Sequence, residues 1–409
     1  MNTFAPGKFL GIMLLAGFFL RMGFAFYAGE PERADYWEYG IIAQNLLDGQ
    51  GYSFYYFEDD DYRIAFNSDE EAIPSAYMPP GYVIFLVPFF LIENEWLRNL
   101  SILFFQNILA ILGIFFLFQL SRQLFSEKTA HLAAAIASFL PAFIFASNSF
   151  GPTAIYHFLI PLFFYLIIKK PAQPLIFFPV IGLLAGAIIL LRAEFALFII
   201  FLVGYWSWKL SWHKVLLFLL GAWLVLAPWQ VRNYLVFEEF VPITTNSGLN
   251  LHRGHNSIGH GTWGQYNEVL SSVPEEYRNH KLEPYLNEKF RSKATAFIVE
   301  HPGETVINSL EKFFIFWTID PADERSTHAL YWLPWMVLLL TFIYSLYATS
   351  WREVSKEHLL FFAHFVVVAV IFFVLPRYQV LMKIMVIPYA ALGLLLIWEK
   401  ISARASESS

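Results

Sequence analysis

Asp35 follows the first apolar block of the chain and opens an aromatic-rich segment. A carboxylate there could act as general base, taking a proton from an acceptor hydroxyl or amide while that group attacks a sugar's anomeric carbon. The pattern Asp35-x-x-Glu38 is also typical of a capping box and predicts a helix from Tyr36 to about Asp48. An ionised group at a lipid interface is costly without a partner or a task. Both roles stay open, and they are compatible because a capping residue is held rigidly.

Several cations stand within or beside apolar sequence. Arg192 and Glu194 interrupt two apolar runs, and Arg377 follows Pro376, with Lys383 nearly two turns further along. In a purely structural interpretation, Arg192 lies in a turn and forms an ion pair. In the functional interpretation it binds a phosphate, because the guanidinium fork matches phosphate oxygens. Arg377 and Lys383 allow the same phosphate hypothesis. We expect Arg21, inside the first apolar block, to extend outward to the membrane surface.

Metal binding has weak support in the sequence. The acidic runs at 58–61 and 69–71 are typical of solvated loops, although their oxygens could hold a divalent cation. His252, His255 and His260 are close together, but their spacing matches no common zinc site. The chain contains no cysteine, so disulfides and thiolate ligands are excluded. We predict no resident metal, and a divalent cation stays open only as a minor alternative.

The composition predicts an all-α polytopic integral membrane protein. Of the 409 residues, 57% are hydrophobic and only 15% are charged, against roughly 25% in soluble domains. The 44 phenylalanines gather in repeated apolar blocks, too many for one soluble core. No basic tract suggests nucleic acid. The first block starts after a single lysine and lacks a small-residue cleavage site, so we interpret it as a retained span.

Apolar runs of membrane length predict about ten spans, or 10–12 if two shorter blocks at 80–93 and 305–319 also cross. We interpret these two blocks as re-entrant or interfacial helices. The ten runs lie near 9–28, 99–119, 129–147, 152–168, 174–191, 194–208, 214–230, 329–349, 358–375 and 379–398. With the N-terminus inside, every short loop rich in lysine and arginine falls in the cytoplasm.

This orientation collects the polar residues on the non-cytoplasmic face and divides the chain into three parts. Residues 1–230 form an N-terminal membrane module that contains the first outer loop, 29–79. Residues 231–304 form a polar outer region, with a helix predicted from about Glu283 to Glu300, and 305–409 form the C-terminal membrane helices. We therefore expect one site on the outer side, with interfacial helices in the first outer loop.

Nine short stretches together resemble the GT-C superfamily of polyprenyl-phosphate-sugar-dependent membrane glycosyltransferases, which includes protein O-mannosyltransferases and aminoarabinose transferases. They are residues 35–36, 43–52, 75–82, 227–237, 240–251, 297–298, 301–302, 312 and 377–378. The sequence differs from the superfamily pattern at two places. Ser149-Phe150-Gly151-Pro152 replaces a glutamate that the family often has after the third span, and Leu191-Arg192-Ala193 replaces Thr-Arg-Pro.

The resemblance implies a GT-C fold in the plasma (inner) membrane with the active site facing the periplasm or exterior. It implies that Asp35 is the catalytic base, that Arg377 and, more loosely, Arg192 bind the lipid phosphate, and that transfer inverts the sugar. Glu194, Tyr77, Tyr378 and Lys383 are further candidate substrate-binding residues. The implied partners are a polyprenyl-phosphate-linked sugar, a glycan, lipid or protein acceptor, and membrane lipids.

Two other functions remain open from the sequence. A flippase or transporter of lipid-linked sugars would need a polar path across the membrane or two related halves with broken helices. An O-antigen ligase or polymerase would use a diphosphate donor and call for more arginines in the outer loops. The spans show little charge in their inner halves and no internal repeat, so glycosyl transfer is the preferred hypothesis.

Overall fold

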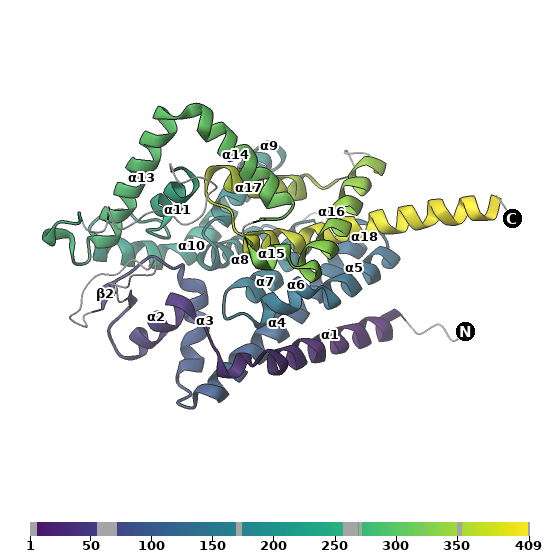
Figure 1. Ribbon diagram of the computed structural model, residues 1–409, viewed down its shortest axis with the longest axis horizontal. Helices are drawn as coiled ribbons and strands as arrows, with labels where there is room; N and C mark the ends of the chain where they lie inside the picture. The colour runs from purple at the N-terminus through teal and green to yellow at the C-terminus, as the bar shows by residue number, and fades with distance from the viewer. Residues whose placement is uncertain are drawn as a thin grey trace.

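The computed structural model describes residues 6–54, 72–168, 174–256, 269, 272–321, 323–349 and 354–407. This part of the chain is an elongated helical bundle, in which α1 and α18 carry the two termini to the same end (Figure 1). One large core runs through it, and large side chains such as Phe163, Phe198 and Trp335 are almost fully buried. The all-α membrane class predicted from composition is confirmed.

The first half of the bundle contains ten α-helices, one 3-10 helix and a two-residue β-ladder among the described residues. They are α1 (Pro6–Ala28), η1 (Glu30–Glu32), α2 (Trp37–Leu47), β1 (Ser53–Phe54), β2 (Ile73–Pro74), α3 (Pro80–Phe90), α4 (Glu95–Leu124), α5 (Glu127–Phe139), α6 (Pro141–Asn148), α7 (Thr153–Ile168), α8 (Phe177–Leu191), α9 (Phe195–Lys209) and α10 (Trp212–Phe237). The two strands pair antiparallel, Ser53 opposite Pro74.

The second half begins with the polar region and returns to membrane helices. Its elements are α11 (Ser247–Gly254), η2 (Glu275–Tyr277), α13 (Leu282–Glu300), α14 (Pro302–Trp317), α15 (Glu324–Thr327), α16 (Ala329–Ala348), α17 (Lys356–Ile371) and α18 (Pro376–Glu407). The helix predicted from Glu283 to Glu300 is confirmed as α13. It ends at His301, where Pro302 begins α14, and the two helices form a V at the top of Figure 1.

Fewer helices reach full spanning length than the apolar blocks suggested. Within the described residues, five helices are long and apolar enough to cross a membrane: α1, α4, α10, α16 and α18. A sixth is obtained if α5 and α6, bent by 55°, count as one span. Four further apolar helices, α3, α7, α8 and α9, have 11 to 16 residues. At 1.5 Å per residue they are about 16–24 Å long, shorter than the roughly 30 Å hydrocarbon core.

The helices α8 and α10 cross closely, and glycine makes this possible. A Cβ on Gly182 would lie 2.1 Å from the Phe218 carbonyl oxygen, and one on Gly221 would lie 2.2 Å from that of Pro179. Small residues of this kind let helix backbones approach closely inside a membrane, where packing rather than water exclusion drives association. This crossing fixes the outer end of α8, at which Arg192 stands.

Arg21 does not extend outward, contrary to the sequence expectation. Its side chain is 1% exposed and points into the bundle, where Nη1 donates to the Ser138 carbonyl at 2.7 Å and Nη2 to that of Ala137 at 3.0 Å. These carbonyls belong to the last turn of α5, which Pro141 prevents from continuing straight. A cation at a helix C-terminus satisfies such carbonyls and matches the helix dipole. Arg21 therefore stabilises the bend between α5 and α6.

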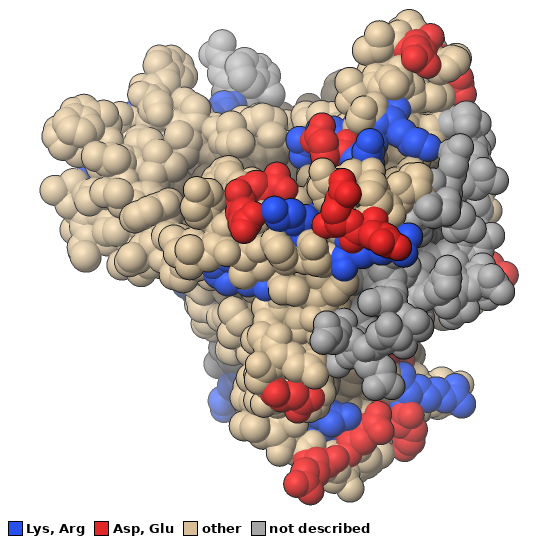
Figure 2. Space-filling model, turned by 90° about the vertical axis from the view of Figure 1, so that its left-hand side faces the viewer, with Lys and Arg blue, Asp and Glu red and all other residues tan. Residues whose placement is uncertain are grey.

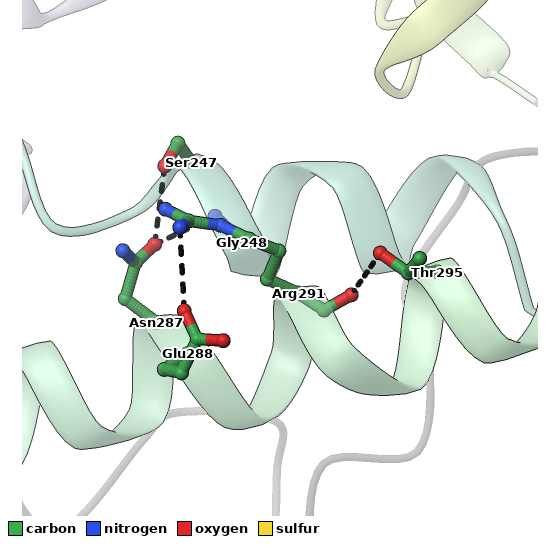
Figure 3. Close-up of polar contacts among 6 residues, drawn as sticks. All are labelled: Ser247, Gly248, Asn287, Glu288, Arg291 and Thr295. Atoms are coloured by element: carbon green, nitrogen blue, oxygen red, sulfur yellow. Dashed lines mark hydrogen bonds and ion pairs between the residues drawn. The ribbon is translucent and has the colours of Figure 1, made fainter.

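The polar segments that follow α1 and α10 meet at the end of the bundle opposite the termini, where α2, β2, α11 and the start of α13 lie together (Figure 1). The backbone N–H of Thr245 donates to the Ala76 carbonyl at 3.1 Å. Figure 3 shows how α11 is held on α13: Asn287 Oδ1 accepts from the Gly248 N–H at 2.6 Å and from the Ser247 hydroxyl at 3.2 Å. Both outer segments thus form one polar cap.

Candidate active site

Asp35 lies on the surface of this cap, immediately before α2. Its Oδ1 accepts a hydrogen bond from the backbone N–H of Trp37 at 3.0 Å. The predicted capping box is wrong: the residue at the N-cap position is Tyr36, which makes no side-chain cap bond, and the helix runs only from Trp37 to Leu47. Trp37 has a φ of 51°, so the chain turns sharply there. Among the described residues, Asp35 therefore accepts a bond only from the backbone N–H two residues later. The second carboxylate oxygen carries no hydrogen bond from a described group.

The beginning of α2 is tied firmly to the membrane helices. The Tyr36 hydroxyl donates to Asn99 Oδ1, and Asn99 Nδ2 donates to the Pro31 carbonyl at 2.8 Å. The Tyr36 ring lies between Phe90 and Phe150, with centroid distances of 5.2 and 4.7 Å. Burial raises the pKa of Tyr36 to about 12, so its phenol is neutral at pH 7. Asp35 is therefore held on a rigid base although it is itself exposed.

Arg192 and Glu194 form the predicted ion pair in the turn between α8 and α9, with Nε and Oε1 3.1 Å apart. Both side chains are largely enclosed, at 16% and 25% exposed. The Arg192 guanidinium carbon lies 5.7 Å from the centroid of the Tyr378 ring on α18. Elements distant in sequence thus converge on one cation.

Two contacts connect this cation to the segment around Asp35. Tyr39 stands on α2, one turn after Asp35, and its ring meets that of Tyr82 on α3 at 5.1 Å. Gly81, beside it, approaches α8 so closely that a Cβ would lie 2.8 Å from the carbonyl oxygen of Leu190 and from the backbone of Leu191. The carboxylate and the arginine are therefore linked indirectly through α2, α3 and α8.

The other predicted binding residues fall in different surroundings. Arg377 is the second residue of α18, and its side chain lies outside the described part of the structure. Lys383 is 1% exposed, and its ammonium lies over the rings of Tyr331 and Trp335, 4.0 and 4.7 Å from their centroids. Such enclosure gives cation–π stabilisation in place of hydrogen bonds.

Tyr77 packs in surroundings different from those of Arg192. It contacts the small apolar cluster around Leu249, Leu282 and Phe290, and its carbonyl accepts from Asn246 Nδ2 at 2.8 Å. The structure therefore gives Tyr77 a place between the two outer segments. Arg192, Glu194 and Tyr378 lie together, whereas Tyr77 and Lys383 contact other residues.

Two charged residues of the cap were missed as site residues by the sequence analysis. Glu283, in the first turn of α13, is 4% exposed and accepts from the Ser75 hydroxyl at 2.5 Å, the Ala76 N–H at 2.7 Å and the Thr245 hydroxyl at 2.6 Å. Arg232, near the end of α10, donates to the carbonyls of Ser75 at 2.7 Å and Tyr52 at 2.6 Å. The only signal in the sequence was the inclusion of Ser75 and Arg232 in stretches that resemble a known superfamily.

A groove of about 470 Å³ lies beside Arg232, between α2, α3 and α10. Most of its lining is apolar and includes Leu46, Ile84, Trp229 and Val236. Ile84 is 61% exposed, and α10 presents the exposed residues Val231 and Leu235 nearby in sequence. The groove suits an apolar chain more than a charged group, because the Arg232 donors are directed at backbone carbonyls.

The described residues contain no group of three or more His, Asp or Glu side chains that could hold a metal ion. The acidic runs at 58–61 and 69–71, and His260, lie outside the described residues. His255 Nε2 contacts the Ile371 carbonyl at 2.8 Å, and Lys312 Nζ donates to the carbonyls of Gly254 and Phe372, both at 3.0 Å. These two residues tie α11 to the segment that precedes α18.

Charged side chains gather on the end face of the molecule that carries the cap. Figure 2 views this end and shows acidic and basic residues side by side in a band across its centre, with a second group below. Charges of both signs keep the face hydrated, as expected for a surface that contacts lipid headgroups and water.

Comparisons with known proteins support the resemblance found in the sequence. The family model for dolichyl-phosphate-mannose-protein mannosyltransferase matches residues 78–231. The fold resembles the archaeal oligosaccharyltransferase AglB from Archaeoglobus fulgidus in complex with an inhibitory peptide and a dolichol-phosphate, with a TM-score of 0.55, 13% identity, and coverage of 98% of this chain and 51% of that one. The same enzyme tethered with an acceptor peptide gives a TM-score of 0.56 at 13% identity, covering 98% of this chain and 50% of that one.

A lower similarity is found to ArnT from Cupriavidus metallidurans bound to undecaprenyl phosphate, with a TM-score of 0.39, 13% identity and coverage of 94% of this chain and 77% of that one. No curated protein sequence matches the chain. The chain spans about half the length of the oligosaccharyltransferase structures, and at 13% identity these show a shared fold. The GT-C resemblance expected from the sequence is confirmed.

Proposed function

We propose that this protein is a membrane glycosyltransferase that moves one sugar from a polyprenyl-phosphate donor to an acceptor outside the cytoplasm. The proposal rests on two groups that are linked indirectly through α2, α3 and α8: the exposed carboxylate Asp35 and the enclosed cation Arg192. In such a transfer a base must take the proton from the attacking group, and a cation must offset the charge that grows on the leaving phosphate. The solved relatives that contain dolichol-phosphate or an acceptor peptide support the same classes of donor and acceptor.

In the proposed reaction, Asp35 takes the proton from an acceptor hydroxyl or amide as the acceptor attacks the anomeric carbon. The bond between that carbon and the phosphate oxygen breaks, the configuration inverts, and the polyprenyl phosphate leaves with both electrons. Arg192 and Arg377 offset the charge that grows on the leaving phosphate. Glu194 orients Arg192 through the 3.1 Å ion pair, and Tyr378 covers its face.

The proposal includes a location in the plasma membrane with the active site facing the periplasm or exterior. It is supported by the basic short loops, which all fall on the cytoplasmic side when the N-terminus is inside. The sugar and the acceptor are identified only by class: a monosaccharide on a lipid phosphate, and a glycan, lipid or protein of the cell envelope. Accessibility labelling of a cysteine introduced at Gln44 tests the orientation, since the chain has no native cysteine. Labelling from the cytoplasmic side only would contradict it.

The decisive experiment is sugar transfer by purified protein, using radiolabelled polyprenyl-phosphate sugars and envelope extracts as acceptors. Asp35→Asn is expected to lose at least about a hundredfold in rate, because general-base catalysis contributes about 10²–10⁴-fold. Asp48→Asn is the matched control, since Asp48 is an exposed carboxylate at the other end of α2 and accepts a hydrogen bond from Gln44 Nε2. Transfer that is unchanged in Asp35→Asn would remove Asp35 from the mechanism, and uptake of the lipid-linked sugar without transfer would favour a flippase.

A further inference from the structure

The peptide group between Ser75 and Ala76 is held at both ends by opposite charges. Its carbonyl oxygen accepts from Arg232 Nη1 at 2.7 Å, and its N–H donates to Glu283 Oε2 at 2.7 Å. Hydrogen bonds to ionised groups are shorter and stronger than neutral ones. The peptide dipole is aligned between cation and anion, so each charge strengthens the bond made by the other. Arg232 and Glu283 therefore interact through this one peptide group.

The other hydrogen bonds of Glu283 and Arg232 are made to residues near the same peptide group. Glu283 also accepts from the hydroxyls of Ser75 and Thr245, and Arg232 also donates to the Tyr52 carbonyl. These bonds offset the cost of burying a carboxylate, which would otherwise be large. Three pieces of chain that are far apart in sequence, at 52, 75–76 and 245, are thereby fixed to α10 and α13.

Further hydrogen bonds connect the residues held by Arg232 and Glu283 to α2. The Tyr52 carbonyl that Arg232 binds also accepts from the Ser75 N–H at 3.0 Å, and Asn45 Nδ2 on α2 donates to the Ser53 carbonyl at 3.0 Å. The Tyr52 hydroxyl donates to the Met78 carbonyl at 2.8 Å. The position of α2, and of Asp35 just before it, therefore depends on the strands that the two charges hold.

Ala76 is also connected to α3 and, through it, to the turn at Arg192. Residues 76–80 run directly into α3, whose Gly81 lies against the backbone of Leu190 and Leu191. Arg192 itself stands on the α8–α9 turn, where it pairs with Glu194. A shift of the 75–80 segment would thus move α2 and α3 relative to α8 and the turn that carries Arg192.

We propose that Arg232 and Glu283 are positioning residues that act as one unit through the Ser75–Ala76 peptide and set the place of Asp35 relative to Arg192. Neither residue touches the reacting atoms. The effect of these two residues on catalysis rests on the proposed glycosyl transfer, whereas their effect on the structure does not. The second outer segment, through α13, therefore controls the geometry of the first.

The structural consequence is tested by distance measurement between spin labels. Gln44 on α2 and Ser292 on α13 are exposed, and cysteines introduced there are the only ones in the chain. Double electron–electron resonance is expected to give one narrow distance distribution in the parent protein and a shifted or broadened one in Glu283→Gln and in Arg232→Gln. An unchanged distribution in both variants would overturn the proposal.

A matched control removes a charge from the same junction without touching the peptide group. Lys281, one residue before α13, forms an exposed ion pair with Glu238 at the end of α10, at 2.7 Å. Lys281→Gln is expected to keep the parent distribution. If Glu283→Gln does not fold, Thr245→Val removes one of the Glu283 bonds at nearly constant volume and is expected to shift the distribution in the same direction.

The catalytic consequence is tested by separating turnover from donor binding. Glu283→Gln is expected to lower kcat by about ten- to a hundredfold, because a displacement near 1 Å can cost about 10²-fold, and to leave the Kd for polyprenyl phosphate within about twofold. The double variant Arg232→Gln/Glu283→Gln is expected to lose no more than the worse single variant, because the two residues act as a unit. Additive losses, or an equal loss of donor binding, would contradict the proposal. If the parent protein transfers no sugar, the proposed function fails while the distance measurement still decides this inference.

Discussion

Arg232 and Glu283 bind the two ends of a single peptide group, although 51 residues separate them in the chain and neither approaches the other directly. A strand segment with only two ladder residues would be weak by itself, since isolated short hairpins are marginal in water. Charge-assisted bonds from two helices replace the missing ladder. The first outer segment of the protein therefore owes its shape to the second.

Arg192 should control affinity for the lipid phosphate. Arg192→Gln removes the cation and leaves Glu194 without its partner at 3.1 Å, so the Kd for polyprenyl phosphate is expected to rise at least about tenfold, as loss of a hydrogen bond to a charged group costs about 1.5–3 kcal/mol. Native mass spectrometry or calorimetry in detergent measures this Kd. Arg291→Gln, in an exposed ion pair with Glu288, serves as control. Equal affinity of Arg192→Gln and the parent protein would exclude Arg192 from the phosphate site.

The contact between α11 and α13 should be sensitive to a single methyl group. A Cβ on Gly248 would lie 1.9 Å from the Asn287 carbonyl oxygen, so Gly248→Ala must displace one helix, and overpacking of this kind costs about 1–3 kcal/mol. Gly303→Ala, with nothing within 4 Å of the added Cβ, is the control on α14. Thermal unfolding in detergent should show a lower Tm for Gly248→Ala only. Similar midpoints for both variants would mean that α11 does not pack as tightly as described.

His255 should make the polar cap sensitive to acid. Burial and the neighbouring cation Lys312 lower the pKa of His255 to about 4, against about 6.5 in the unfolded chain. Between pH 4 and pH 6.5 the unfolded state binds more protons at His255 than the folded state does. The contribution of His255 to the free energy of unfolding is therefore fully present above pH 6.5 and is lost as the pH falls toward 4. The expected loss from pH 7 to pH 5 is on the order of 1 kcal/mol.

His255→Gln should reduce this acid sensitivity, because glutamine does not titrate. His301→Gln, which changes an exposed histidine at the end of α13, should keep the parent dependence. Chemical denaturation or Tm measured between pH 5 and 8 compares the three proteins. Identical pH profiles for His255→Gln and the parent would show that another group carries the acid sensitivity.

Arg21 should matter for stability and not for chemistry. Arg21→Leu removes donors to the carbonyls of Ala137 and Ser138 and leaves the bend between α5 and α6 without its cation. Buried carbonyls that lose a partner cost about 1–3 kcal/mol each, so the Tm is expected to fall by several degrees while polyprenyl-phosphate binding at saturation is retained. Leu20→Ala, on the exposed face of α1, is the control. A Tm equal to that of the parent would contradict the capping role.

Local sequence patterns were sufficient for part of this protein because the forces behind them are local. Long apolar runs with few charges determine membrane helices, and Pro302 after His301 determines where α13 ends. Arg192 and Glu194, two residues apart across a turn, could be paired from the sequence because the turn itself brings them together. The GT-C resemblance likewise depended on short stretches that keep their order along the chain.

Only the tertiary structure decided which partners the other polar groups obtain. Glu283 was predicted merely to begin a helix, yet it binds Ser75, 208 residues earlier, because two outer segments fold onto each other. Arg21 was expected to reach the membrane surface, but a bent helix beside it offered unpaired carbonyls. Asp35 lost its capping role to a sharp turn at Trp37. In each case a buried or strained group takes the nearest partner in space, and nearness in space is set by the packing of the whole bundle.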